Sequence, residues 1–242
     1  MNTAYETSEI LLITGAGLSA ESGISTYRDA DGLWQNFDIK QVCHAEGWRK
    51  HYREMHAFYS ELRQAIGQAQ PNAAHREIAR WQSVFQDRLH IVTQNVDDLL
   101  ERTGCHSVLH VHGMITRMRC EHCLDVWDIG YKAWNPDYAM CCTEDRPDTR
   151  PDIVFFEEPA PLYARMYELV ERIASNANNV VIVIGTDGAV IPIQAMLANK
   201  PCKKVLCNLH PSKYMLESIF DDIYTEPATQ SLANISRWLL GE

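Results

Sequence analysis

Two histidines, His110 and His112, stand two residues apart in the segment "SVLHVHG" (107–113), which is mostly apolar and ends in a glycine. Residues two apart in a strand point to the same side, so both imidazoles would share one face. A histidine at the end of a strand can act as a general base near neutral pH, whereas a lone histidine more often has a structural role. The segment therefore offers a candidate base, with packing as the alternative.

A second polar group follows another apolar run. The segment "TQNVDD" (93–98) places Gln94, Asn95 and Asp97 where that run ends. Carboxamide and carboxylate groups can pair with the amide and hydroxyl groups of a ligand. The alternative is an Asx cap on a helix that begins near Val96.

The segment "GAGLSA" (15–20) follows the apolar run "EILLIT" and matches the G-x-G-x-x-G/A pattern of dinucleotide-binding turns at Gly15, Gly17 and Ala20. Glycines in such a turn let backbone N–H groups approach a pyrophosphate. A tight turn without a ligand is the alternative. A standard dehydrogenase is disfavoured, because the polar loop "GISTYRDADGLWQNF" stands where a second strand should lead to an acidic residue.

Four of the eight cysteines lie close together: Cys120 and Cys123 form C-x-x-C, and Cys141 and Cys142 follow after 17 intervening residues. This interval is typical of zinc ribbons, in which four thiolates surround one Zn²⁺. Because the second pair is adjacent, a strained turn is needed for both thiols to reach one ion, and His122 or water could complete the site instead. The sequence predicts zinc, with a degenerate site of free thiols as the alternative.

A sheet must position these residues. Short apolar runs rich in β-branched residues predict strands at 9–15, 89–95, 107–113, 152–156, 179–185 and 203–209. Helical patterns lie between them, including 44–68, 72–85, 163–177 and 228–242. This alternation predicts an α/β fold, a Rossmann-like doubly wound parallel sheet that binds ligands at its strand carboxyl ends. Residues 114–150 lack this alternation of strands and helices and are expected to form a small inserted module within a single domain spanning 1–242.

Charge and hydropathy narrow the function further. A formal net charge of −10 opposes binding to nucleic acid. The N-terminus lacks the pattern of a signal peptide, and no apolar run approaches the roughly 20 residues of a membrane span. We therefore expect a cytoplasmic protein with neither a nucleic-acid nor a membrane partner; the oligomeric state is left open.

Six ordered segments, from residue 9 to the C-terminus, carry a family resemblance. They read "GAGLSAESGISTYR", "TQNVDDL", "HVHG", "RPDIVFFEE", "GTDG" and "CNLHPS". In this order and spacing they resemble the sirtuins, NAD-dependent protein-lysine deacylases with a small zinc-ribbon-like module. In that family the acyl-lysine oxygen attacks the anomeric carbon of the nicotinamide ribose, nicotinamide leaves, and a histidine acts as base toward a ribose hydroxyl. The acyl group ends on ADP-ribose.

The resemblance assigns roles to positions of this chain. The base is His112, while His110 packs nearby. Residues implied to contact NAD are Gly15, Ala16, Gly17 and Ala20 near the phosphates, Tyr27 and Arg28 in the cofactor loop, Gln94 at the ribose, Asn95 and Asp97 in the nicotinamide pocket, and Gly185, Thr186, Asp187 and Asn208 on the adenosine side. The implied zinc ligands are Cys120, Cys123, Cys141 and Cys142.

This chain departs from the family pattern in the substrate region. Glu157 replaces a glycine on the strand that includes Val154 and Phe156 and is expected to pair with an acylated-lysine peptide. Asp187 replaces a serine and sets a carboxylate near the diphosphate, where it could weaken NAD binding.

Acyl preference is open. Sirtuins that remove acidic acyl groups carry a small loop residue and a Tyr-x-x-Arg pair; Ala30 and Tyr59 fit, but the arginine is one position later, at Arg63. Arg63 could still reach a carboxylate, because residues four apart share a helix face, and a surface arginine is the alternative.

Two other functions remain open at this stage. The altered strand at Glu157 would suit ADP-ribosyl transfer or NAD glycohydrolysis, and Asp187 would suit a module that binds NAD or ADP-ribose without turnover. The retained Asn95, Asp97 and His112 favour the deacylase.

Overall fold

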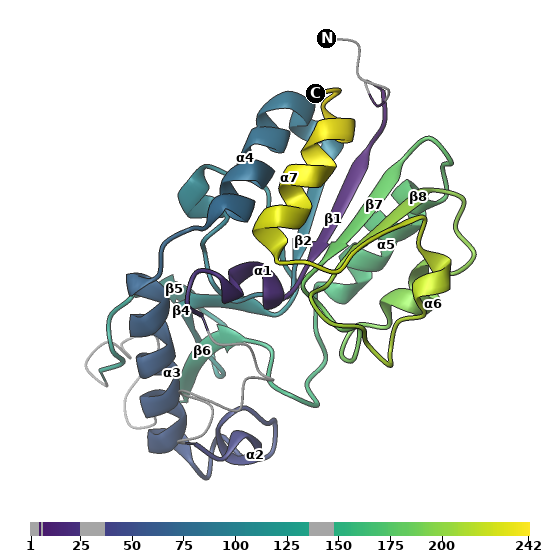
Figure 1. Cartoon of the computed structure of the whole chain (residues 1–242). Coiled ribbons are helices and arrows are strands. Elements are labelled where there is room, and N and C mark those ends of the chain that lie inside the picture. Colours follow the sequence, from purple (N-terminus) through teal and green to yellow (C-terminus); the bar gives the residue numbers. More distant parts are fainter. Residues whose placement is uncertain (1–4, 6, 25–36, 136–147) are drawn as a thin grey trace.

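A parallel six-stranded sheet forms the centre of the molecule (Figure 1). The computed structural model describes residues 5, 7–24, 37–135 and 148–242. In sheet order the strands are β3 (Leu109–His110), β2 (Leu89–Thr93), β1 (Ile10–Thr14), β7 (Val180–Ile184), β8 (Lys203–Cys207) and β9 (Asp222–Tyr224). The chain runs outward from β1 to β3 and returns beside β1 as β7, so strand order reverses between β1 and β7. The predicted Rossmann-like α/β fold is confirmed, and β9 is a strand that the sequence reading missed.

Helices cover both faces of this sheet (Figure 1). The helices α4 (Ala73–Phe85) and α7 (Ala228–Leu239) pack on one face, with Ile10 and Leu12 of β1. The helices α5 (Tyr163–Ala174) and α6 (Ile193–Leu197) pack on the other, with Leu11 and Ile13. Because alternate residues of β1 serve opposite layers, the strand is apolar throughout, as its sequence indicates.

A small lobe, comprising the described parts of 37–68 and 113–155, lies below the parallel sheet (Figure 1). Its antiparallel sheet has the order β5-β4-β6. These strands are β4 (Gly113–Cys120), β5 (Val126–Asp128) and β6 (Thr149–Ile153). The helices α2 (Ile39–Val42) and α3 (Tyr52–Gln68) share its core, in which Phe58 and Ile66 pack with Ile115 and Phe155.

Two predictions are corrected by the small lobe. The strand expected at 152–156 lies at Thr149–Ile153 and pairs antiparallel with β4, so it is no part of the parallel sheet. The helix expected at 44–68 begins at Tyr52 and packs in the small lobe. An apolar run shows that a segment is buried but does not show which sheet buries it.

Gly113 joins the two sheets. It has φ +88°, and a Cβ there would lie 2.0 Å from the backbone oxygen of Asp152. Only glycine permits this close approach and this backbone conformation together. His112, which directly precedes it, is therefore held at the boundary between the parallel sheet and the small lobe.

The remaining short elements lie in connections. Helix α1 (Gly17–Ala20) follows β1, and 3-10 turns lie at Gln86–Arg88, Glu101–Thr103 and Glu217–Ile219. Among the described residues, no helix combines the length and the apolar character needed to cross a bilayer.

Candidate active site

The glycine turn after β1 packs directly on the loop after β7. The amide of Gly15 donates to the carbonyl of Ile184 at 2.9 Å, and the amide of Gly17 donates to that of Gly185 at 2.9 Å. A Cβ on Gly17 would lie 2.6 Å from Gly185 Cα, and one on Gly15 would lie 2.7 Å from Thr186 Cβ. Both amides are thus hydrogen-bonded inside the protein. These glycines are required for the close contact between two loops at the point where strand order reverses.

A buried polar network lies beneath this turn. Ser19 Oγ donates to Asp97 Oδ2 at 2.9 Å and accepts from Asn95 Nδ2 at 3.1 Å, with His75 Nε2 3.4 Å away. Burial raises the pKa of Asp97, although hydrogen bonds from Ser19 and Leu99 oppose the rise. The network brings together Asn95 and Asp97, two of the three residues predicted after β2.

The helix that the alternative places near Val96 does not form, although Asp97 Oδ1 accepts the amide of Leu99 at 3.1 Å as in an Asx cap. No helix begins at Val96, because the chain from Gln94 to Leu100 is irregular and the next element is the 3-10 turn at Glu101–Thr103. Sequence reasoning missed Ser19 and His75. His75 could have been noticed, because it completes a capping box with Asn72 at the start of α4.

His112 makes two hydrogen bonds that define its protonation. Its Nδ1 lies 2.9 Å from the carbonyl oxygen of Gln94, and its Nε2 lies 2.8 Å from the hydroxyl of Tyr163. A carbonyl oxygen only accepts, so we assign the proton of the neutral ring to Nδ1 and the acceptor role to Nε2. Burial lowers the pKa of His112 and the bond to Gln94 partly offsets this. The ring is therefore suited to accept a proton at Nε2.

His110 is bound on both ring nitrogens. Its Nε2 lies 2.7 Å from Glu101 Oε1 and its Nδ1 lies 3.0 Å from the backbone oxygen of Asn95. The residue is buried. These contacts fit the packing role expected for His110.

Further polar groups lie in the loops that follow β7 and β8. Gln94 Nε2 donates to Thr186 Oγ1 at 3.0 Å, and Asn208 Nδ2 donates to the Thr186 carbonyl at 2.7 Å. Asp187 Oδ1 accepts from the amide of Ala189 at 2.9 Å, so this carboxylate binds its own loop. Amide, hydroxyl and carboxylate groups thus follow several adjacent parallel strands. Together they can donate hydrogen bonds to, and accept them from, the ribose and amide groups of a dinucleotide.

The segment that follows β6 connects His112 to the small lobe. The amide of Val154 donates to the His112 carbonyl at 2.9 Å. Phe156 forms an isolated parallel β-bridge with His44. Phe156 is 39% exposed. Glu157, at φ +68°, lies 3.4 Å from His44 Nε2. A cavity of about 310 Å³ is lined by Ile39, Lys40, His44, Phe156 and Glu157.

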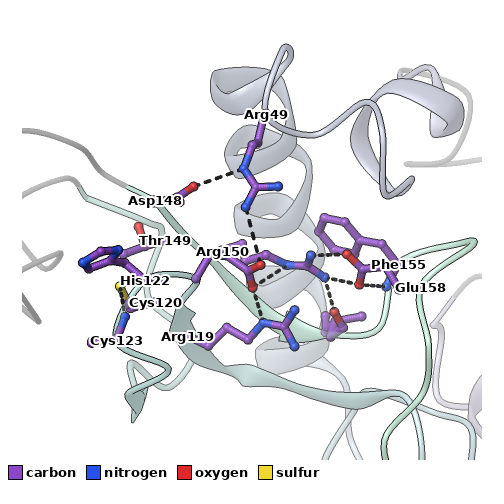
Figure 2. Close-up of polar contacts among 12 residues, drawn as sticks. Arg49, Arg119, Cys120, His122, Cys123, Asp148, Thr149, Arg150, Phe155 and Glu158 are labelled. Atoms are coloured by element: carbon purple, nitrogen blue, oxygen red, sulfur yellow. Dashed lines mark hydrogen bonds and ion pairs between the residues drawn. The ribbon is translucent and has the colours of Figure 1, made fainter.

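A buried arginine holds this segment in place (Figure 2). The Arg150 guanidinium binds both carboxylate oxygens of Glu158, donates to the Ile153 carbonyl at 2.6 Å and lies 3.6 Å from the Phe155 ring centroid. Glu158 Oε2 in turn accepts from the amide of Phe155 at 2.9 Å. The turn that presents Phe156 and Glu157 is therefore fixed by an ion pair beneath it.

Tyr59 and Arg63 do not form the pair expected for acidic acyl groups. Tyr59 is buried and stacks on Phe155, with ring centroids 5.5 Å apart. Arg63 is fully buried, and it donates to the carbonyls of Ile115 at 2.8 Å and Lys132 at 3.3 Å. The surface alternative for Arg63 is wrong, and its guanidinium contacts argue against a role in acyl recognition.

The described half of the cysteine cluster forms a tight turn between β4 and β5 (Figure 2). Cys120 Sγ accepts the amides of His122 at 3.4 Å and Cys123 at 3.5 Å. Such amides stabilise a thiolate, so the turn fits half of a four-thiolate site. Within the part of the chain that the structure describes, no three metal-binding side chains gather. Five of the predicted site residues lie outside the described part of the chain: Tyr27, Arg28, Ala30, Cys141 and Cys142.

Comparison with known proteins agrees with this architecture. The model of the Sir2 family matches residues 15–192. The NAD-dependent protein deacylase of Campylobacter jejuni is 39% identical over 227 residues, which are 94% of this chain and 94% of that protein. The protein of the same name from Helicobacter hepaticus is 37% identical over 251 aligned positions, covering 96% of this chain and 97% of that protein.

Solved structures extend the similarity to the fold. A mutant Sir2 homologue in complex with ADP-ribose has a TM-score of 0.84 and 28% identity, covering 98% of this chain and 94% of that one. A Sir2 homologue–NAD complex has a TM-score of 0.82 and 28% identity, covering 98% and 92%. With its parallel sheet, its small antiparallel sheet and a histidine between them, and with a family match over most of its length, this chain belongs to the Sir2 family.

Proposed function

We propose that this chain is an NAD-dependent protein-lysine deacylase. The observation that carries the proposal is His112, whose Nδ1 donates to the Gln94 carbonyl so that Nε2 is the proton acceptor. It stands at the carboxyl ends of the parallel strands, where α/β sheets bind nucleotides. The two relatives described above bear the name of this activity, which supports the proposal.

We propose that NAD lies along the strand ends on both sides of the point where strand order reverses. Gly15, Ala16, Gly17 and Ala20 would line the diphosphate, Gln94 the nicotinamide ribose, Asn95 and Asp97 the nicotinamide, and Gly185, Thr186, Asp187 and Asn208 the adenosine. Tyr27 and Arg28 would cover the cofactor. Bound NAD would supply the anomeric carbon of the nicotinamide ribose for attack by the acyl oxygen, with nicotinamide as the leaving group.

His112 then acts as the general base. Its Nε2 would take the proton of a ribose hydroxyl, while the Gln94 carbonyl stabilises the Nδ1–H of the resulting imidazolium. Asp97 and Ser19 hold the carboxamide of Asn95 through Ser19 Oγ. These residues fix the pocket before the reaction rather than transferring protons themselves.

We propose an acylated lysine of a protein as the substrate, held along Val154, Phe156 and Glu157. The side chain of Glu157 is 70% exposed and lines the cavity beside Phe156. It therefore favours a peptide with a basic residue near the acyl-lysine. The cytoplasmic location expected from the sequence remains a prediction.

We also propose a structural Zn²⁺ held by Cys120, Cys123, Cys141 and Cys142. The support is the pair of backbone amides directed at Cys120 Sγ, together with the spacing of the four thiols in the sequence. Zinc would cross-link the turn at Cys120 and Cys123 to the part of the chain that carries Cys141 and Cys142.

One experiment tests the deacylase against its rivals. The purified protein is incubated with NAD and an acetyl-lysine peptide, and nicotinamide and deacetylated peptide are both quantified. Equal amounts of the two products are expected. Nicotinamide without deacetylated peptide would instead support ADP-ribosyl transfer or glycohydrolysis, which the positive φ of Glu157 and its contact with His44 favour as the second candidate. NAD binding without either product would support a non-catalytic module.

A further inference from the structure

Tyr163 is the first residue of α5, 51 residues after His112 in the chain, and its hydroxyl lies 2.8 Å from His112 Nε2. The two ring centroids are 5.8 Å apart at an interplanar angle of 49°. Because Nδ1 already donates to Gln94, Nε2 carries the lone pair, and the Tyr163 hydroxyl must be the donor. The hydroxyl therefore occupies the one nitrogen of this ring that can accept a proton.

We propose that Tyr163 is a positioning residue for the base. Its hydroxyl donates to Nε2 of His112 and keeps the imidazole directed at the strand ends. A ribose hydroxyl then displaces it and donates its own proton to Nε2. The inference rests on the proposed function, since only a reaction that uses His112 as a base needs the nitrogen uncovered.

The surroundings of Tyr163 fit this role. The backbone amide of Tyr163 donates to the Ala160 carbonyl at 3.1 Å, which fixes the start of α5. Its ring contacts Tyr167 edge to face, with centroids 6.1 Å apart. Burial raises the pKa of Tyr163, and Tyr167 adds to this, so the hydroxyl keeps its proton where His112 is neutral. The phenol is thus a donor throughout the working pH range.

The neighbouring titratable groups on the other elements are engaged elsewhere. His110, on the strand that leads to His112, pairs with Glu101. Asp97, in the loop after β2, binds Ser19 and the amide of Leu99. The polar contacts that the structure gives to the His112 ring within the described residues are therefore Gln94 on one side and Tyr163 on the other.

A measurable consequence follows from the direction of this hydrogen bond. A donor to Nε2 stabilises neutral histidine and opposes protonation. Removing the hydroxyl in Tyr163→Phe should raise the pKa of His112 by about half to one unit, the size of one ordinary hydrogen bond. The acidic limb of the deacylation profile should move to higher pH by the same amount.

The test uses ¹⁵N-labelled full-length protein without NAD. The ring nitrogens are followed by long-range ¹H–¹⁵N spectra from pH 5 to 8, and the His112 signals are assigned by their loss in His112→Gln. In the wild type, Nδ1 is expected to carry the proton and Nε2 to show the shift of a hydrogen-bonded acceptor. Tyr163→Phe should change the Nε2 shift and raise the pKa. The matched control, Tyr167→Phe, removes a neighbouring hydroxyl and should change neither.

Several results would overturn the inference. They are an Nε2 shift and a pKa that are unchanged in Tyr163→Phe, an equal change in Tyr167→Phe, or a wild-type ring protonated on Nε2. Circular dichroism and thermal unfolding of each variant establish that the fold is retained. The spectra need no turnover, so a failed deacylase assay with the expected spectra would reject the proposed function and leave the contact intact.

Discussion

The substitution Gly17→Ala separates two reasons for the glycine after β1. If Gly17 only lets a phosphate approach, alanine should stabilise the protein in the absence of NAD, because alanine at the start of α1 gains up to about 1 kcal/mol of helix propensity over glycine. In the structure, however, the new Cβ would lie 2.6 Å from Gly185 Cα and 3.1 Å from the Gly185 oxygen. The two explanations therefore predict changes of opposite sign.

The magnitude follows from these distances. Carbon atoms pack at about 3.5–4.0 Å, so the two loops must separate by roughly 1 Å. Overpacking of this kind costs about 1–3 kcal/mol, from which the gain in helix propensity is subtracted. We expect a net loss of up to about 2 kcal/mol and a fall in Tm of up to about 8 °C for a chain of this size.

The assay is thermal unfolding without NAD, followed by calorimetric titration with NAD. Gly17→Ala should lower Tm and weaken NAD binding, because displaced loops alter both sides of the proposed site. Gly104→Ala is the control: Gly104 has φ +95° and a Cβ there would meet open space, so alanine strains the backbone without touching the strand ends. The control should lose stability and keep its NAD affinity. A higher Tm for Gly17→Ala would refute the packing argument.

Three further outcomes are expected. His112→Ala should abolish deacylation in the peptide assay while NAD affinity by calorimetry changes little, and wild-type activity should extend below the ordinary histidine pKa of 6.5, because burial lowers the pKa of His112. Arg150→Met should lower the free energy of unfolding in urea by about 1.5–3 kcal/mol, because the half-buried carboxylate of Glu158 loses the guanidinium that hydrogen-bonds it. Burial alone raises the pKa of Glu158, but its hydrogen bonds with Arg150 hold this pKa below its ordinary value of 4.5. The wild type should therefore lose this stabilisation as the pH falls below 4.5, and the variant should not. Metal analysis should find about one zinc per chain, with less in Cys120→Ser; metal-free wild-type protein would reject the site.

Much of the fold could be predicted because it depends on local patterns. The strands at Ile10–Thr14, Leu89–Thr93 and Val180–Ile184 are short, mostly apolar runs, which suit a sheet covered on both faces. The strand Thr149–Ile153 was placed in the wrong sheet, because burial alone leaves open which partner strand supplies the hydrogen bonds.

The candidate site, like the fold, could be predicted from the sequence only in part. The sequence marked Gln94, Asn95, Asp97 and His112, because polar residues after apolar strands fall at the edge of a sheet where ligands bind. It carried no signal for Tyr163, whose contact with His112 spans 51 residues and depends on where α5 begins. It also left Arg63 ambiguous between binding an acidic acyl group and lying on the surface, whereas folding buries it against the carbonyls of Ile115 and Lys132.

Sequence alone thus determined the α/β architecture, the family resemblance and the residue types gathered for catalysis, since these depend on the order and periodicity of residues along the chain. Only the tertiary structure decided how those residues are used. It revealed that the Gly15 and Gly17 amides bind the neighbouring loop, that Ser19 links Asn95 to Asp97, and that His112 presents Nε2 under the hydroxyl of Tyr163. Each of these depends on distances between segments remote in sequence, which hydrophobic periodicity does not specify.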